Sequence, residues 1–336
     1  MSEPADTGAG HARRLRNGII TLAVLLILVG GLLFAVPGLH GVQRVVTRMT
    51  PGWVVAAVAL ELLSCAGYVL IFLRVFHRLP VIFGARVALT EMAFGAAVSL
   101  GGAGSLAVGV WLLRERGVAM SEIAERSAVL FLLTSTINLI TLIGTGLLMG
   151  LGLIPGPTSA LLTLLPAGVG VLLVAFFLTL PLLTERGANA RKTGRLATLL
   201  RGVGNTIRDT RRTLLRPDWR LLGAFAYLWC DIAVLWACFR ATGHGPPLGV
   251  IVLAYQIGYL ANVIPVPGNV GVLEGSLVGM FVLYGGSATT AAAASVVYHG
   301  IALWIPLIWG TIAFIRLQAQ RHEPLLQKPE RASSKE

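Results

Sequence analysis

One apolar stretch decides the fold: residues 249–284 read GVIVLAYQIGYLANVIPVPGNVGVLEGSLVGMFVLY. Its middle, residues 265–271, contains two prolines and two glycines. Proline removes an amide donor and glycine tolerates conformations that other residues avoid, so we expect non-helical backbone there. The flanking apolar pieces, of roughly 11 to 15 residues, are too short to cross a hydrocarbon core of about 30 Å as a helix. The stretch is therefore predicted to enter a membrane and return to the same side as a re-entrant hairpin.

A second apolar stretch, residues 87–113, has the same pattern, with the break SLGGAG at residues 99–104. Paired interrupted segments in corresponding halves of a chain indicate an inverted-repeat transporter whose site lies at the breaks. A shift of 169 positions places Gly102 on Gly271 and Gly117 on Gly286, which supports such a repeat. The alternative is that both breaks only relieve helix packing. We favour a functional role, because bare backbone at membrane depth is costly unless it lines a cavity.

The chain as a whole is strongly apolar. Of its 336 residues, 55% are apolar and only 12% are charged, which is more apolar surface than a soluble protein could hide. We therefore predict an all-α integral membrane protein, because a helix satisfies its backbone polar groups within the segment. About six full transmembrane helices are expected besides the two hairpins, at residues 18–36, 53–73, 127–152, 159–183, 221–240 and 291–315.

The basic residues predict an orientation. The net charge is +12, and the arginines gather at the ends of apolar segments, which fits anionic lipid headgroups and not nucleic acid. Six crossings and two returning hairpins place nearly every basic loop on one side, including the ten Arg or Lys of residues 186–220. Arg44 and Arg48 are the exceptions. By the positive-inside rule, both termini are cytoplasmic, in the cytoplasmic (plasma) membrane, and the hairpins enter from opposite faces.

These patterns divide the chain into a cytoplasmic N-terminal tail at residues 1–16, a transmembrane domain at residues 17–316 and a polar cytoplasmic tail at residues 317–336. Within the domain, residues 185–220 form a basic cytoplasmic segment whose leucines recur at helical spacing. The spacing predicts an amphipathic helix lying on anionic lipid. A solvated linker is the alternative.

Five ionisable residues fall inside apolar segments, where a charge costs about 2.5 kcal/mol or more. Glu61 and Asp231 lie near the middle of two spans, His299 lies in the last span, and Glu91 and Glu274 lie on the two hairpins. If these side chains face one cavity, they could bind a cation, exchange protons or hold a polar headgroup. The alternative for each is a structural hydrogen bond between helices.

Motifs for catalysis and nucleotide binding are missing from the sequence. The GGAG of residues 101–104 follows no predicted strand and precedes no Lys-Ser/Thr pair, and neither HExxH nor a nucleophile elbow occurs. Cys65, Cys230 and Cys238 form no metal-ligand pattern and are interpreted as small packing residues. We therefore expect no enzyme activity, no metal, no cofactor and no nucleic-acid partner, and the oligomeric state stays open.

The run NVIPVPGNVGVLEG at residues 262–275, followed by Gly285-Gly286, an alanine-rich run and the WIP of residues 304–306, carries a resemblance. It resembles the C-terminal signature of the lysylphosphatidylglycerol synthase transmembrane-region family, membrane proteins related to the N-terminal half of bacterial multiple peptide resistance factors. The residues of this chain that match the motif are Pro265, Pro267, Gly268, Gly271 and Glu274. Asn269 stands where the family often has a glycine, and His299 where an arginine commonly follows the tyrosine.

The resemblance implies a flippase-like domain that moves a polar-headed lipid, anionic or lipid-linked, between leaflets. The 336 residues leave no room for a soluble aminoacyl-transferring domain, so we expect no synthase activity. A membrane-embedded enzyme or an accessory subunit acting on lipid-linked substrates is the alternative. The expected substrate-binding residues are Glu274, Pro265, Pro267, Gly268, Gly271, Asn269, Gly101, Gly102, Gly104, Glu61, Asp231, Glu91 and His299.

Overall fold

The computed structural model describes residues 40–97, 103–157, 159–188, 195–216, 218–243, 245–259 and 272–322, and the regular elements among them are all helices. Five of these helices are long and apolar enough to cross a membrane. They match five of the six expected spans, so the prediction of an all-α membrane protein is confirmed. The expected span at residues 18–36 and the N-terminal tail lie outside the described residues. The five long helices are α3 (Pro51–Val75), α6 (Met120–Gly150), α7 (Ala160–Ala188), α9 (Leu222–Ala241) and α12 (Ala288–His322).

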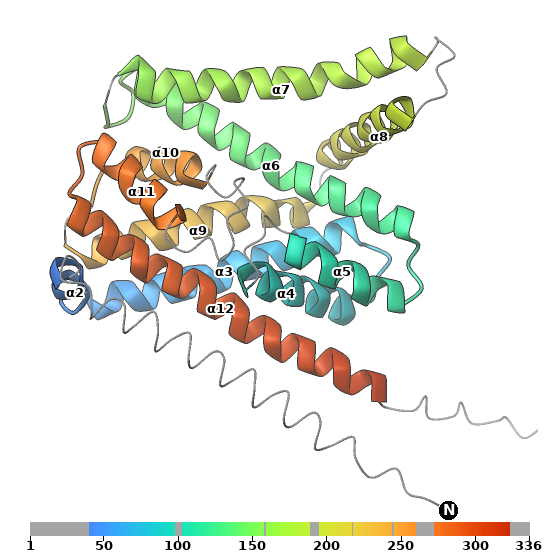
Figure 1. Cartoon of the computed structure of the whole chain (residues 1–336), viewed down its shortest axis with the longest axis horizontal. Helices are drawn as coiled ribbons and strands as arrows, with labels where there is room; N and C mark the ends of the chain where they lie inside the picture. The colour runs from blue at the N-terminus through green and yellow to red at the C-terminus, as the bar shows by residue number, and fades with distance from the viewer. Residues whose placement is uncertain are drawn as a thin grey trace, which may run out of the picture.

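Four shorter helices occupy the two stretches that the sequence predicts to be broken. In the first, α4 (Val81–Ala97) packs against α5 (Ala103–Glu115), and in the second, α10 (Leu248–Tyr259) packs against α11 (Val272–Leu283). Each pair lies at its own end of the molecule, α4 and α5 at the right and α10 and α11 at the left of Figure 1. The breaks themselves fall within residues 98–102 and 260–271, which lie outside the described residues, and re-entry into a membrane stays a prediction.

Two boundaries in the first stretch differ from the prediction. Helix α4 begins at Val81, directly after Pro80, and not at residue 87, because the single Arg86 does not end a helix. Helix α5 already begins at Ala103, so Gly104 is helical and not part of the break. Its predicted place in an open loop is wrong, since a lone glycine inside an apolar helix costs only about 1 kcal/mol relative to alanine.

The crossing of α3 and α9 forms the centre of the fold, and these two helices run antiparallel. Gly67 lies against Gly223 near one end of the crossing, and the Thr50 amide donates to the Ala241 carbonyl (2.9 Å) near the other. A Cβ atom on Gly67 would lie 2.8 Å from the Gly223 oxygen, and one on Gly223 would lie 2.5 Å from the Gly67 oxygen. Small residues of this kind allow transmembrane helix backbones to approach closely.

The two halves of the chain repeat one another with inverted direction. The order α3, α4, α5, α6 is matched by α9, α10, α11, α12, and α6 and α12 run in opposite directions in Figure 1. One turn fixes the register: Gly117 (φ 79°) follows α5 and Gly285 (φ 84°) follows α11. After each glycine, the next amide donates to a carbonyl five residues earlier, at 3.2 Å and 2.8 Å. The glycines are 168 positions apart, so the predicted pairing of Gly117 with Gly286 is wrong by one residue.

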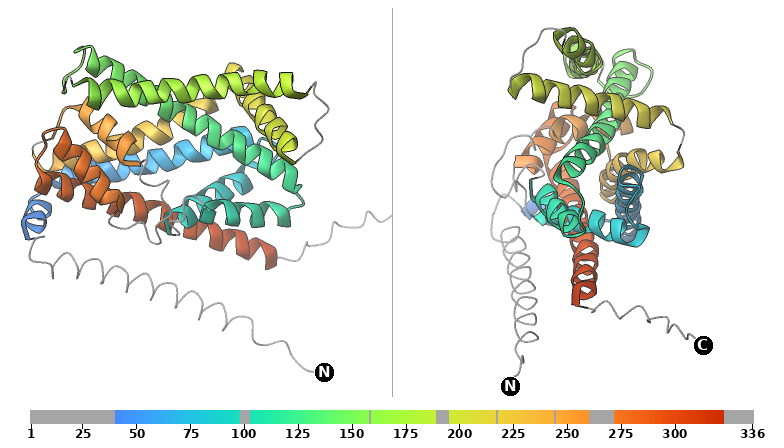
Figure 2. Two further views of the ribbon diagram at one scale, coloured as in Figure 1. Left: turned by 45° about the horizontal axis from the view of Figure 1, so that its top comes forward. Right: turned by 90° about the vertical axis from the view of Figure 1, so that its right-hand side faces the viewer.

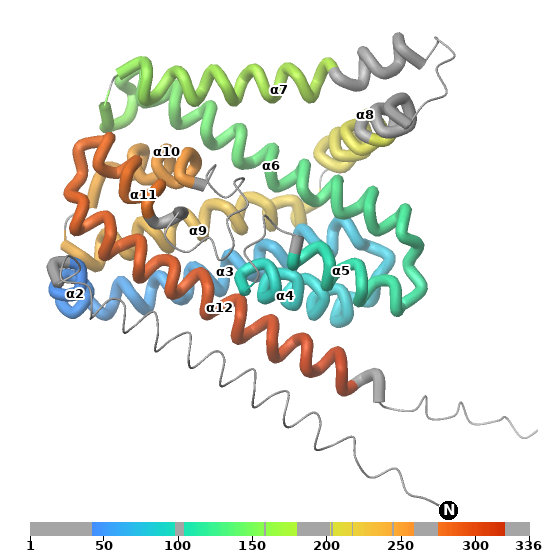
Figure 3. Tube along the Cα trace, in the orientation of Figure 1, coloured from blue at the N-terminus to red at the C-terminus, as the bar shows by residue number. Residues whose placement is uncertain are grey.

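Helices α7 and α8 cover this repeat on one face. Helix α8 (Arg195–Leu215) lies against α6 and α7, and α7 lies along the outside of α6, as the two views of Figure 2 show. The tube in Figure 3 follows the chain from α2 (His40–Val46) to α12. The expected helix in the basic segment is therefore present. Its placement on a lipid surface stays a prediction.

Candidate functional site

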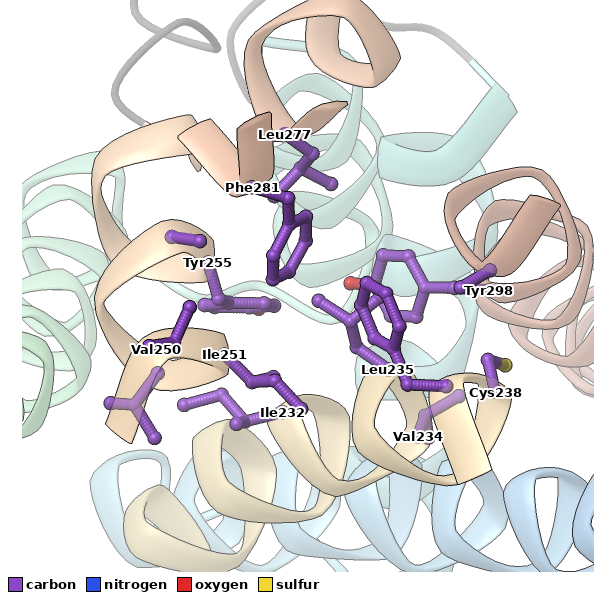
Figure 4. Packing of buried hydrophobic residues seen from close by; sticks show 14 of the residues in the cluster. Ile232, Val234, Leu235, Cys238, Val250, Ile251, Tyr255, Leu277, Phe281 and Tyr298 are labelled. Carbon is purple, nitrogen blue, oxygen red and sulfur yellow. The ribbon is translucent and has the colours of Figure 1, made fainter. Parts of the chain in front are cut away.

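Asp231 of α9 is the most heavily hydrogen-bonded carboxylate of the described core. The hydroxyl of Tyr298 on α12 lies 3.0 Å from both carboxylate oxygens, and the hydroxyl of Tyr255 on α10 donates to Oδ2. Both tyrosines are buried, with 0% and 4% of their surfaces exposed. Figure 4 shows the two rings approaching from different helices among Ile232, Leu235 and Phe281. Three helices thus converge on one half-buried acid.

Glu61 brings a fourth helix, α3, to the same centre. Its side chain is 3% exposed, and the Asp231 carboxylate lies close enough to repel it electrostatically. Glu61 Oε1 lies 3.8 Å from the Cys65 sulfur, while none of the described residues donates a hydrogen bond to Oε2. A buried carboxylate oxygen without a donor is unfavourable. Among the described residues, Oε2 therefore lacks a donor, and the site is suited to a proton, a cation or a donor group of a ligand.

The surroundings of these two acids are apolar. The cluster that encloses them contains Leu228, Ile232, Ile251, Leu277 and Phe281, all at most 5% exposed. In the described part of the chain, neither acid forms an ion pair with Lys or Arg. Two neighbouring carboxylates in such surroundings cannot both stay charged without compensation. We call this group of four residues, Glu61, Asp231, Tyr255 and Tyr298, the central acid site.

Glu91 on α4 occupies a second polar site. Its Oε2 accepts a hydrogen bond from the Tyr68 hydroxyl of α3 (3.1 Å), and the side chain is 7% exposed. The carboxyl group lies directly over Gly109 of α5, where an added Cβ atom would be 1.7 Å from Oε1. The glycine therefore makes room for the acid, and no larger residue fits there while Glu91 keeps this position.

A line of polar side chains connects the two sites along the α3 and α9 interface. The ring of Tyr68 lies 5.2 Å from that of Tyr227 on α9, and the Ser64 hydroxyl donates to the Tyr227 carbonyl (2.9 Å). Tyr227 in turn lies close enough to Asp231 and Glu61 for their carboxyl groups to interact with its hydroxyl electrostatically. Polar groups thus extend through the apolar crossing from Glu91 to the central acid site.

The structure brings together only some of the residues predicted from the sequence. Glu61 and Asp231 share one site and Glu91 has another, whereas His299 packs its ring against Tyr298 at 4.9 Å and is half-buried. Glu274 lies in the first turn of α11, and its side chain is not among those described. Gly104 lies in the first turn of α5. The other predicted residues lie outside the described residues: Pro265, Pro267, Gly268, Asn269, Gly271, Gly101 and Gly102.

Sequence reasoning missed the hydroxyl groups of the two sites. Tyr68, Tyr255 and Tyr298 all lie within apolar segments, where a phenol needs a hydrogen-bond partner when it is buried. An apolar segment that contains a tyrosine, opposite a segment that contains an acid, is the signal that could have identified them. Among the described residues, no three His, Cys, Asp or Glu side chains gather in a group that could hold a metal ion.

This geometry defines a class of protein: a multi-pass helical membrane protein with acids at a helix crossing between two pairs of short helices. The family model for the lysylphosphatidylglycerol synthase TM region matches residues 18–310, and the chain belongs to this family. A UPF0104 membrane protein of Methanothermobacter thermautotrophicus is 36% identical over 115 residues, covering 34% of this chain and 32% of the relative. A second UPF0104 membrane protein of that organism is 25% identical over 341 positions, covering 93% and 96%.

Proposed function

We propose that this protein is a transporter of the flippase type, which moves a polar-headed lipid between the leaflets of the cytoplasmic membrane without modifying it. The headgroup passes along the polar line between Glu91 and the central acid site, while the acyl chains remain in the bilayer. Glu61 and Asp231 bind the headgroup or the proton or cation that accompanies it. The termini are cytoplasmic in this proposal.

One observation carries the proposal: the central acid site has a buried carboxylate oxygen to which none of the described residues donates, inside an apolar crossing. Intramembrane acids are costly, and they typically mark substrate paths and proton relays. The site lies between two pairs of short helices, in halves that repeat with inverted direction. This is the architecture in which alternating access occurs around a site at the membrane midplane. The family name, which refers to a synthase of a modified phosphatidylglycerol, supports a lipid as the substrate.

The test is a lipid translocation assay with the purified full-length protein in liposomes. The vesicles carry trace fluorescent lipids with anionic, zwitterionic or cationic headgroups, and dithionite bleaches the label that reaches the outer leaflet. We expect bleaching beyond the outer-leaflet pool for at least one headgroup class. Asp231→Asn and Glu61→Gln are expected to slow it by about tenfold or more, because each removes an ionisable group from the path.

The matched control is Glu125→Gln, which removes an exposed carboxylate on α6 and is expected to leave the rate unchanged. A protein that moves no lipid class, with or without a proton or sodium gradient, would contradict the proposal. A covalent change in the extracted lipids would favour a membrane-embedded enzyme instead.

A further inference from the structure

A second candidate site lies just beyond the C-terminal end of α3. A cavity of about 340 Å³ opens between the α3–α4 loop and the α5–α6 loop. Phe76 and Phe83, 3% and 8% exposed, form an apolar floor. The charged residues of its lining are Arg78, Arg116, Glu122 and Arg126, and we call this cavity the arginine pocket.

The three arginines differ in how firmly they are held. Arg126 is fixed, because its Nε donates to Glu122 Oε1 (2.9 Å) and its Nη1 donates to the Val75 carbonyl. Arg78 reaches the same Glu122 oxygen only at 3.5 Å, and its side chain is 74% exposed. The Arg116 guanidinium lies over the Phe83 ring at 4.6 Å and forms no ion pair with a carboxylate of the described residues.

The charge balance of the arginine pocket favours an anion. Three guanidinium groups face one carboxylate, which leaves two positive charges uncompensated in the lining. Guanidinium groups bind phosphate oxygens through paired N–H donors, and they do so most strongly where water is partly excluded. Arg78 and Arg116 extend from two different loops, so both can turn toward one bound group.

The repeat shows that the turn after α5 does not require its arginine. The corresponding turn of the second half has the same left-handed glycine, and the amides of that glycine and of the next residue donate to equivalent carbonyls. With the shift of 168 positions between the two glycines, Arg78, Arg116 and Arg126 correspond to Pro246, Tyr284 and Ala294, none of which is charged. Since the turn at Gly285 forms with Tyr284 in the place of Arg116, the backbone of this turn does not account for the arginine.

We propose that the arginine pocket binds the phosphate of an anionic phospholipid from the adjoining leaflet. A phosphate group would lie between Arg78 and Arg116, and the glycerol and first acyl carbons would cover the accessible apolar residues of the lining, Leu79, Pro80 and Val118. Basic pockets between transmembrane helices at the cytoplasmic surface bind anionic headgroups in this way. The apolar floor distinguishes a lipid from free phosphate, which has no apolar part to cover it.

The test measures binding by the full-length protein in a neutral detergent and does not depend on transport. Phosphatidylglycerol, phosphatidylcholine and inorganic phosphate are titrated separately, and bound ligand is followed by native mass spectrometry and by the melting temperature. We expect saturable binding of phosphatidylglycerol and little effect of the other two. In Arg78→Gln/Arg116→Gln the affinity should fall roughly thirtyfold, as expected for two arginines in contact with an anionic headgroup.

The control is Arg44→Gln/Arg48→Gln, which removes the same charge from exposed arginines outside the pocket and is expected to bind like the unmodified protein. Should the double variant at Arg78 and Arg116 fold poorly, Arg78→Gln alone decides, because this side chain is mostly exposed. Unchanged phosphatidylglycerol binding in the variants at Arg78 and Arg116 would overturn the proposal. Equal affinity for inorganic phosphate would overturn the assignment to a lipid.

Discussion

The two halves of this molecule share a backbone plan and differ in their polar groups. Helices α3 to α6 and α9 to α12 follow the same order, and each half turns at a left-handed glycine, Gly117 or Gly285, before its last long helix. The glycine amide and the next amide donate to equivalent carbonyls in both turns, and the helices that follow begin at Met120 and Ala288, also 168 positions apart. Backbone geometry and small residues are therefore what the repeat preserves.

The acids and arginines are placed differently in the two halves. The first half holds Glu91 over a glycine with one tyrosine donor, whereas the second holds Asp231 with two tyrosine donors. The first half alone has the arginine pocket at its turn. Because the same fold forms with either set, these groups are not needed for the backbone. The polar groups, and not the backbone plan, therefore distinguish the two ends of the molecule.

The first prediction tests the inversion itself and has an all-or-none outcome. Ala119 and Ser287 are exposed, lie two residues after the two left-handed glycines and correspond in the repeat. Single cysteines at these positions, in a background without the native cysteines, should react with a membrane-impermeant maleimide from opposite sides. We expect Ser287→Cys to be labelled in intact cells and Ala119→Cys only after permeabilisation. Labelling of both from one side would exclude an inverted repeat across the membrane.

The second prediction concerns the close crossing that the halves share. In Gly223→Ala, the new Cβ atom would lie 2.5 Å from the Gly67 carbonyl oxygen, which belongs to the backbone and cannot turn away. Helices α3 and α9 must separate, at a cost of about 3 kcal/mol in the free energy of unfolding. The melting temperature in detergent measures the loss.

Gly144→Ala is the matched control for that crossing, because Gly144 lies inside α6 and nothing lies within 4 Å of its added Cβ atom. It should be neutral or stabilising by about 0.5 to 1 kcal/mol, as for any glycine inside a helix. If Gly223→Ala has the same melting temperature as this control, the crossing is not held by close backbone contact.

The sequence predicted the positions of the long apolar helices well and the polar contacts between helices poorly. The five long helices lie where apolar runs of sufficient length predicted them, because length and hydropathy alone determine whether a segment can span a membrane. The partners of Asp231 could not be predicted in this way, because Tyr255 and Tyr298 come from helices whose approach depends on tertiary packing. The register of the repeat was off by one residue, since Gly285 and Gly286 are equivalent in sequence and only φ distinguishes them.

The third prediction sharpens the difference between the two acids. Gly109→Ala should displace the Glu91 carboxyl group from its place over α5 and break the hydrogen bond from Tyr68, at a cost of about 2 kcal/mol. In Glu91→Ala/Gly109→Ala the clash is gone, so the double variant should lose less stability than the sum of the two single variants. A double-mutant cycle of melting temperatures measures this coupling, and strict additivity would mean that Glu91 does not occupy this place.

The smallest expected effect distinguishes the two donors of Asp231. Tyr298→Phe removes a hydroxyl that lies 3.0 Å from both carboxylate oxygens, while the Tyr255 hydroxyl still donates to one of them. The ring stays in its apolar surroundings, so we expect a loss of only about 1 to 2 kcal/mol in unfolding free energy. Trp219→Phe, at an aromatic ring that is 64% exposed, provides a control that should leave the melting temperature unchanged.

In Asp231→Asn, the Tyr298→Phe change should cost less than in the unmodified protein, because a hydrogen bond to a charged group is stronger than one to an amide. An equal cost in both backgrounds would mean that the tyrosine stabilises the fold by packing alone and that the two halves differ less in their polar chemistry than their sequences indicate.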